Sequence, residues 1–334
     1  MLKHTNYPLK GLNTFGIEAY AREYIEVHGN EALLSLFSKN PGKHLILGGG
    51  SNVLFRSDFD GVVIRIAMHG KKIIGTMPGK LLLEVSAGED WDDLVAYCVD
   101  RNWGGLENLS LIPGQVGSSP IQNIGAYGVE LKDHFYSLTA FDKEKKEFSV
   151  FDKKACRFGY RNSFFKQNGK NRFVITSVIF ALDTRPIPQT AYGSLRSELD
   201  KTGIDRPKIK DVRQVVCSIR RSKLPDPDEL GNAGSFFKNP VISGQTYLQL
   251  RERFPDMVVF DDPKGKKLAA AWLIDQAGWK GYRRGDAGVH EKQALVIVNH
   301  GKATGNEIIQ LADEIQRSVI EKYGVRLEPE VNII

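Results

Sequence analysis

Two glycine-rich segments have the composition and spacing of loops that bind a cofactor. The first, Gly48-Gly49-Gly50-Ser51-Asn52, lies between two apolar runs. Consecutive glycines let backbone N–H groups converge on an anion, because no Cβ blocks its approach. This segment therefore suits a pyrophosphate, although a tight turn between two strands explains three glycines about equally well. It is not a dinucleotide fingerprint of the Rossmann type, because Val53 occupies the third glycine position and no helix is expected to follow.

The second segment covers residues 104–128 and contains six glycines and two prolines. It is too apolar to be a flexible linker, and a long stretch without regular structure inside a globular protein is often functional. Its glycines would let the backbone run along the edge of a flat cofactor while Ile112, Ile121 and Ile124 cover the rings. A folded Ω-loop without a ligand is the weaker alternative.

Three other segments concentrate polar side chains that a packed core does not need. Residues 158–166 mix aromatic rings with Arg161, and residues 223–240 place Ser235 between a Gly-Asn-Ala-Gly turn and two phenylalanines. Residues 327–331 contain Glu330. A hydrolase nucleophile at Ser235 is disfavoured, because no GxSxG motif surrounds it and the histidines downstream lack a supporting pattern.

The bulk composition limits the classes of protein to consider. The 334 residues are enough for two domains, and 41% hydrophobic with 26% charged residues is ordinary for a globular protein. The net charge of +6 indicates a basic surface or a cleft that attracts small polyanions, and the basic residues form no block of the kind that binds nucleic acid. The three cysteines and seven histidines are scattered, so we expect neither a disulfide framework nor a metal site. No apolar run is long enough for a secretory signal or a membrane span, which predicts a cytoplasmic protein.

The hydrophobic pattern predicts a mixed α+β fold. Helical spacing of apolar residues is found at 30–37, 89–102, 268–276 and 306–323. Strand-like runs are found at 44–47, 62–67, 81–87, 173–182, 258–260 and 294–299, with a hairpin over 137–151. These elements do not alternate regularly, which favours α+β over a doubly wound sheet. The polar stretch 200–211 is a candidate domain boundary.

Taken in order, the motifs closely resemble the UDP-N-acetylenolpyruvoylglucosamine reductases of bacterial peptidoglycan synthesis. The resemblance covers essentially the whole chain and is carried by LNTF (12–15), GGGSN (48–52), IPGQVGSSPIQNIGAYG (112–128), YRNSFFK (160–166), KLPDP (223–227), GNAGSFFKNP (231–240) and LEPEV (327–331). The segment 190–195 is similar to an extra substrate-side loop in the longer, type I-like subtype of this family.

The resemblance implies an FAD-binding domain of the vanillyl-alcohol-oxidase type over residues 1–205, in two subdomains of about 1–70 and 71–205. A C-terminal α+β substrate-binding domain, 206–334, would follow, with its last strand returning to the active site. Because no Gly-Gly-His tripeptide occurs, we expect the FAD to be non-covalent. The residues expected to contact it are Gly48, Gly49, Gly50, Ser51, Asn52, Ile112, Pro113, Gly114, Ser118, Asn123, Gly125 and Tyr127.

The resemblance also implies the reaction. Similar enzymes take a hydride from NADPH onto FAD and pass it to the enolpyruvyl double bond of the UDP-sugar. Arg161 would hold the carboxylate, Glu330 would help to polarise it, and Ser235 would protonate the neighbouring carbon. The substrate would be held by Tyr160, Tyr192, Arg220, Lys223, Asn239 and Gln293. Asn332 stands where the family commonly has Arg, so the position of Glu330 would depend on residues 331–334 pairing into a sheet.

The expected partners are the UDP-sugar and NADPH alone, with no nucleic acid and no membrane, and we expect a monomer. One alternative is another flavin oxidase on the same scaffold, acting on a sugar or alcohol with oxygen as acceptor. A second is a non-catalytic nucleotide- or nucleic-acid-binding protein, which would bind no flavin and would show a strongly salt-dependent affinity.

Overall fold

The chain builds two compact units, each from separate runs of sequence. The computed structural model describes residues 3–334. Unit 1 comprises 22–49 and 60–220 together with the residues up to Asn6, and unit 2 comprises 7–21, 50–59 and 221–334. The first glycine segment is divided between them, because the division falls after Gly49.

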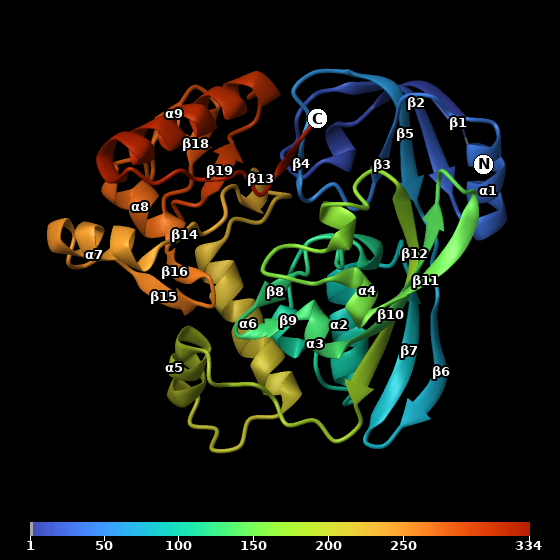
Figure 1. Ribbon diagram of the computed structural model, residues 1–334, viewed down its shortest axis with the longest axis horizontal. Coiled ribbons are helices and arrows are strands. Elements are labelled where there is room, and N and C mark those ends of the chain that lie inside the picture. Colours follow the sequence, from blue (N-terminus) through green and yellow to red (C-terminus); the bar gives the residue numbers. More distant parts are fainter. Residues whose placement is uncertain (1–2) are drawn as a thin grey trace. The chain divides into compact units, whose positions relative to one another are not determined.

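The larger sheet of unit 1 is antiparallel and five-stranded, in the order β11-β10-β12-β7-β6 (Figure 1). In β7, alternate residues Leu81, Leu83 and Val85 are buried on the face that holds the main hydrophobic core. This alternation is the pattern of a strand with one covered face. The strands are β6 (Lys71–Met77), β7 (Lys80–Ser86), β10 (Phe135–Asp142), β11 (Glu147–Asp152) and β12 (Phe173–Asp183).

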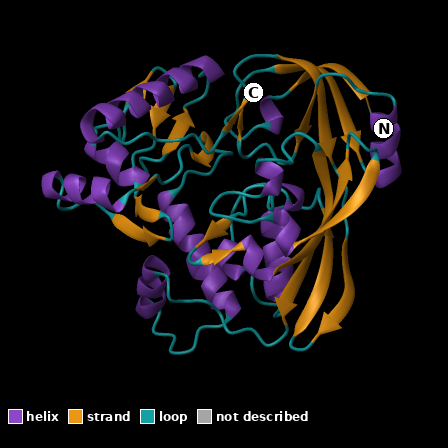
Figure 2. Ribbon diagram, viewed as in Figure 1, coloured by secondary structure: helices purple, strands orange, loops and turns teal. Residues whose placement is uncertain are grey.

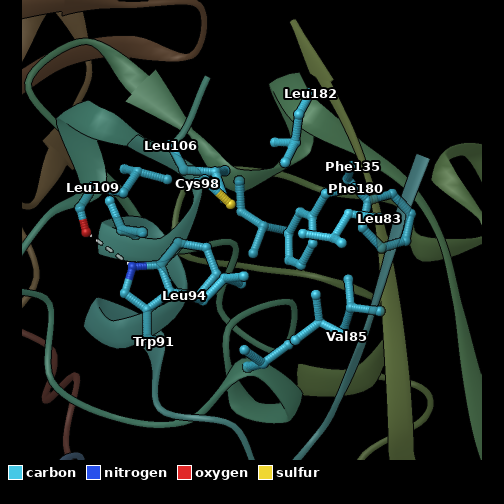
Figure 3. Close-up of a cluster of buried hydrophobic side chains, with 14 of the residues drawn as sticks. Leu83, Val85, Trp91, Leu94, Cys98, Leu106, Leu109, Phe135, Phe180 and Leu182 are labelled. Carbon is cyan, nitrogen blue, oxygen red and sulfur yellow. Dashed lines mark hydrogen bonds between the residues drawn. The ribbon is translucent and has the colours of Figure 1, made fainter. Parts of the chain in front are cut away.

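Helix α2 (Trp91–Asp100) packs into this core. Its N-cap is Asp90, the residue before the helix, whose side chain accepts a hydrogen bond of 3.0 Å from the Asp93 N–H. Figure 3 shows the indole of Trp91 among the buried side chains, with its Nε1–H donating to the Leu109 carbonyl at 2.9 Å. The second glycine segment is therefore fastened to the core near its beginning.

A four-stranded sheet, in the order β1-β2-β5-β3, carries the first glycine segment. Strand β3 pairs in parallel with β5 and ends at Leu47, directly before Gly48. Helix α1 packs on this sheet through Leu33, Leu36 and Phe37. The elements are β1 (Lys3–Pro8), β2 (Tyr20–Val27), α1 (Asn30–Ser38), β3 (His44–Leu47) and β5 (Phe59–Ile66).

The rest of unit 1 is helical or short. Helix α6 buries Val212, Val216 and Ile219 against α5, and Tyr127 packs on the same cluster. The elements are β8 (Gly125–Ala126), β9 (Val129–Glu130), α3 (Leu131–His134), α4 (Lys153–Cys156), α5 (Gly193–Lys201) and α6 (Ile209–Lys223), whose last residues pass into unit 2.

Unit 2 contains a four-stranded sheet in the order β13-β19-β18-β17, which contacts helix α9. A smaller sheet has the order β14-β16-β15, and β4 pairs in parallel with β20 at the C-terminus. The elements are β4 (Val53–Leu54), β13 (Gly231–Ser235), β14 (Val241–Ile242), α7 (Gly244–Arg253), β15 (Val259–Asp262), β16 (Gly265–Leu268), α8 (Ala270–Gln276), β17 (Arg283–Arg284), β18 (Ala287–Val289), β19 (Val296–Asn299), α9 (Gly305–Tyr323) and β20 (Asn332–Ile333).

The predicted α+β class is confirmed, since sheets and helices are both abundant without regular alternation (Figure 2). Within residues 331–334, on whose pairing the position of Glu330 was expected to depend, Asn332 and Ile333 form β20 and pair with β4. Within residues 3–334, no helix combines the length and apolar character needed to cross a membrane.

A lysine–histidine pair at the start of β3 predicts a pH effect on stability. The His44 Nδ1 lies 2.7 Å from the Gly42 carbonyl and its Nε2 lies 2.7 Å from Lys143 Nζ. An ammonium group only donates, so the imidazole must be neutral, with its proton on Nδ1. Burial lowers the pKa of His44 below its ordinary value of 6.5, and the Lys143 charge adds to this, while the bond to Gly42 opposes it.

A depressed pKa means that the stabilising contribution of His44 is complete above pH 6.5 and is lost as the pH falls through the lower folded value. We expect the urea midpoint of the protein to fall between pH 7 and pH 5, and to fall less steeply in His44→Gln. Urea titrations at several pH values would test this, and parallel pH profiles for the two proteins would contradict it.

Candidate active site

The two glycine-rich segments meet backbone to backbone in unit 1. A Cβ on Gly49 would lie 3.0 Å from the Gly114 Cα and 3.5 Å from the Gln115 N. A Cβ this close to backbone atoms would push the two segments apart by a few tenths of an ångström, so glycine at 49 lets them touch. The predicted cofactor residues Gly48, Gly49, Gly114 and Ser118 are thus brought together.

Gly48 and Gly50 differ from Gly49 in what surrounds them. A Cβ on Gly48 would make ordinary contacts with Gln115 Oε1 at 3.4 Å and Ser118 Cβ at 3.6 Å, so space for about one atom is left there. In unit 2, Gly50 has a φ of +67°, and a Cβ would lie 1.9 Å from the Leu12 carbonyl oxygen. Gly50 is therefore required by the fold, whereas Gly48 has room for a Cβ.

Alanine at these three glycines should give three different results. At Gly50 it should destabilise the protein by at least about 2 kcal/mol, through the left-handed backbone and the clash with Leu12. At Gly49 it should push the glycine segments apart. Gly48→Ala should leave the melting temperature of the flavin-free protein nearly unchanged and weaken FAD binding by about tenfold or more, since it fills the space. Melting curves and FAD titrations would check this, and equal loss of stability in all three variants would contradict it.

Asn123 joins the second glycine segment to the segment that carries Arg161. Its Nδ2 donates to Glu130 Oε2 at 3.0 Å and to the Gly159 carbonyl at 3.1 Å, and its Oδ1 accepts from the Lys132 N–H at 3.1 Å. Asn123 is fully buried. These bonds occupy both polar atoms of the Asn123 side chain, which therefore fixes the loop. Any contact of Asn123 with a cofactor would come from its backbone.

Arg161 lies on a tight turn above that junction. Gly159 and Asn162 exchange backbone hydrogen bonds of 2.9 and 3.1 Å, which leaves Tyr160 and Arg161 at the tip. The guanidinium Nη2 donates to the Gly125 carbonyl at 2.7 Å. This bond fixes one arm of the guanidinium fork, and a planar fork held in this way can orient a carboxylate.

The backbone is strained at four positions of these segments. Leu111, Asn123, Tyr127 and Arg161 have φ values of +58°, +45°, +47° and +50°. Left-handed conformations cost side-chain-bearing residues energy and concentrate at ligand-binding sites. Three of the four are predicted site residues.

Tyr127, Tyr192 and Arg220 form a second group in unit 1. The two tyrosine rings meet edge to face with centroids 5.8 Å apart. The Arg220 Nε donates to the Leu111 carbonyl at 3.1 Å. Burial lowers the pKa of Arg220, which Tyr127 and Asp92 oppose. An aromatic face beside a half-buried guanidinium is a combination suited to a base and a phosphate.

Ser235 and Glu330 are placed side by side in unit 2 by backbone pairing. Ser235 is exposed at the end of β13, where it is the register partner of Val296. The next residue, Phe236, accepts a hydrogen bond of 2.7 Å from the Glu330 N–H. Asn52 Nδ2 donates to the Glu330 carbonyl at 3.3 Å. A predicted proton donor, a predicted carboxylate and a predicted cofactor residue therefore share one edge.

The other predicted residues of unit 2 are Gln293, Asn239 and Lys223, and they differ in whether their contacts link them to that edge. Gln293 lies in the turn that precedes β19, and its backbone carbonyl accepts from the Val296 N–H at 3.0 Å, beside Ser235. Asn239 Oδ1 accepts from the Ala270 N–H at 2.9 Å, at the start of α8. Lys223 is exposed at the end of α6. Gln293 is thus brought to Ser235 by the fold, whereas the contacts of Asn239 and Lys223 do not link them to it.

Of the isoleucines expected to cover a cofactor, Ile124 belongs to the hydrophobic core, with 8% exposure, and Ile121 is 39% exposed. Gln115 was not predicted. It is buried beside Gly48 with an unpaired oxygen, and only its place in a glycine-rich loop could have indicated it. Among residues 3–334, no group of three or more His, Cys, Asp and Glu is arranged to hold a metal.

Comparisons with known proteins show the family of this chain. Residues 30–146 match the family described as FAD binding domain, and residues 226–334 match the C-terminal domain of UDP-N-acetylenolpyruvoylglucosamine reductase. The reductase of that name from Flavobacterium johnsoniae is 49% identical, over 99% of this chain and 99% of its own. The one from Pseudomonas aeruginosa is 49% identical over 97% of each chain.

A solved structure agrees as well. The crystal structure of the reductase from Thermus caldophilus has a TM-score of 0.71 and 25% identity, and the match covers 99% of this chain and 98% of that one. The resemblance inferred from the motifs and the expectation of an FAD-binding domain followed by a C-terminal domain are confirmed. The chain belongs to the UDP-N-acetylenolpyruvoylglucosamine reductase family.

Proposed function

We propose that this chain reduces the enolpyruvyl group of UDP-N-acetylenolpyruvoylglucosamine to the lactyl ether of UDP-N-acetylmuramate, with NADPH as reductant and FAD as carrier. Family membership supports the substrate. The observation that carries the assignment of roles is the backbone bond from Glu330 to Phe236, which puts Glu330 next to Ser235. The bound, non-covalent FAD would supply hydride transfer from NADPH to the enolpyruvyl double bond.

The residues of unit 1 suit a cofactor with a pyrophosphate and a substrate with a carboxylate. Gly48 is half-buried and Gly49 is exposed, so a cofactor can reach the backbone of this segment. The other proposed cofactor residues are Gly50, Ser51 and Asn52 of unit 2 and Ile112, Pro113, Gly114, Ser118, Asn123, Gly125 and Tyr127 of unit 1. Arg161, whose guanidinium is oriented by the Gly125 carbonyl, would hold the substrate carboxylate and so stabilise the charge that develops there.

Ser235 would give its proton to the carbon next to the carboxylate. A serine hydroxyl is a weak acid, but an enolate-like carbon is basic enough to take its proton if the hydroxyl lies about 3 Å away. Glu330, whose N–H bonds the carbonyl of Phe236, would help to polarise the same carboxylate. Tyr160, Tyr192, Arg220, Lys223, Asn239 and Gln293 would bind the rest of the UDP-sugar.

The proposal extends to organisation and setting. We propose an FAD-binding domain at 1–205 and a substrate-binding domain at 206–334, in a cytoplasmic monomer that binds no nucleic acid.

The flavin oxidase alternative and the proposed reductase differ in the electron acceptor, which is oxygen for the oxidase and the enolpyruvyl sugar for the reductase. Purified protein, NADPH and the enolpyruvyl UDP-sugar should give a product heavier by two hydrogens, detected by mass spectrometry, with no oxygen consumed in step. Oxygen uptake with a sugar or alcohol, and no reduced UDP-sugar, would favour the oxidase.

A further inference from the structure

Gln115 lies at the contact between the two glycine-rich segments and is 8% exposed. Its backbone carbonyl accepts from the Ser118 N–H at 3.0 Å and from the Ser118 hydroxyl at 2.7 Å. Its side-chain Nε2 donates to the Gly88 carbonyl at 3.1 Å. These bonds fix both the backbone and the orientation of the side chain.

The other side-chain atom, Oε1, accepts no hydrogen bond from any of residues 3–334. Exchanging the two ends of the amide does not remove the problem, because an oxygen would then face the Gly88 carbonyl. Nε2 must therefore point to Gly88, and Oε1 must point away from it. Buried acceptors without a donor are rare in folded proteins, and they commonly mark the place of a ligand or a water molecule.

The unpaired oxygen lies beside Gly48. Oε1 lies 3.4 Å from the point that a Cβ of Gly48 would occupy, and the Ser118 hydroxyl oxygen lies 3.8 Å from the same point. The corresponding space over Gly49 is closed by Gly114 at 3.0 Å. Gly48, which is half-buried, is thus the glycine beside which Oε1 lies.

The chemistry of Oε1 selects the kind of ligand atom. A neutral amide oxygen accepts hydrogen bonds and repels another acceptor, so it does not suit a phosphate oxygen. It suits a hydroxyl. FAD has hydroxyl groups on both sides of its pyrophosphate, on the ribityl chain and on the adenosine ribose. We infer that Gln115 binds the cofactor by accepting a hydrogen bond from one of these hydroxyls over Gly48.

This inference rests on the FAD site described above, and the test separates the two. Apo-protein is prepared from the holoenzyme and titrated with FAD, with binding followed by flavin fluorescence, for the wild type, Gln115→Leu and the control Gln214→Leu. Gln214 is exposed on α6. Gln115→Leu should bind FAD about tenfold more weakly, the usual effect of one neutral hydrogen bond, and Gln214→Leu should bind it as the wild type does.

Apo-protein melting distinguishes a ligand contact from a structural role. Gln115→Leu loses its bond to Gly88 but also removes an unpaired oxygen, so its apo-protein should melt close to the wild type, and only the stabilisation by added FAD should shrink. A parallel titration with FMN, which lacks the adenosine ribose, locates the hydroxyl: weakening of both flavins indicates the ribityl chain, and weakening of FAD alone indicates the ribose.

Two results would overturn the inference. Unchanged FAD affinity in Gln115→Leu would mean that Oε1 serves only a water molecule, and a loss of affinity with an equal loss of apo-protein stability would make Gln115 a structural residue. Failure of the wild type itself to bind FAD would instead refute the proposed function.

Discussion

Ser235→Ala should slow reduction of the enolpyruvyl sugar by about 10²-fold or more, while reduction of the flavin by NADPH continues at the wild-type rate. The hydroxyl is exposed at the end of β13, and the neighbouring residue Phe236 is held from two sides, donating to the Leu295 carbonyl at 2.7 Å and accepting from the Glu330 N–H at 2.7 Å. The backbone should therefore keep its place when the hydroxyl is removed. Losing a positioned proton donor typically costs about 10²- to 10⁴-fold in rate.

Stopped-flow absorption of the two half-reactions would measure this difference. Ser318→Ala, in the middle of α9, is a matched control with the same change of side chain, and it should behave as the wild type in both steps. If Ser235→Ala slows both half-reactions equally, or neither, then Ser235 does not donate the proton.

The second large effect should come from Arg161→Lys. Lysine keeps the positive charge but not the planar fork, so it cannot bond the Gly125 carbonyl and grip a carboxylate in a fixed geometry at once. We expect kcat/KM for the enolpyruvyl sugar to fall by about 10²- to 10³-fold, the usual effect of removing a donor to developing negative charge. The affinity for FAD should be nearly unchanged.

Arg157 provides a close control for that variant. It is also an arginine in the left-handed region, with a φ of +45° against +50° for Arg161, and it is exposed at the end of α4. Arg157→Lys should retain wild-type kcat/KM. It therefore separates the loss of the Arg161 guanidinium from any general effect of placing lysine at a strained backbone position. Equal losses in both variants would remove Arg161 from the proposed mechanism.

Much of the fold could be predicted because it follows from local hydrophobic periodicity. The helix predicted at 306–323 is α9, Gly305–Tyr323, and the hairpin predicted over 137–151 is β10 and β11. Helix α6 was not predicted. Its buried Ile209, Val212, Val216 and Ile219 are spaced as in a helix, but the charged residues between them give the segment the composition of a linker.

The segments that form the site could be predicted from the sequence, but the contacts between them could not. Residue types indicated which segments carry chemistry, and glycines indicated where backbone comes close to something. They could not show that Gly50 is required by Leu12 while Gly48 leaves space, because this depends on which distant segment packs against each. For the same reason, the bonds that occupy Asn123 and leave Gln115 Oε1 unpaired could not be predicted.

The most direct test of the account is the visible absorption of the purified protein without oxygen, with NADPH added first and the enolpyruvyl UDP-sugar second. The flavin band should bleach with NADPH and return when the sugar is added, which would establish both half-reactions. A flavin that bleaches but returns only when oxygen is admitted would contradict the reductase assignment, and a colourless protein that cannot take up FAD would contradict the flavin site itself.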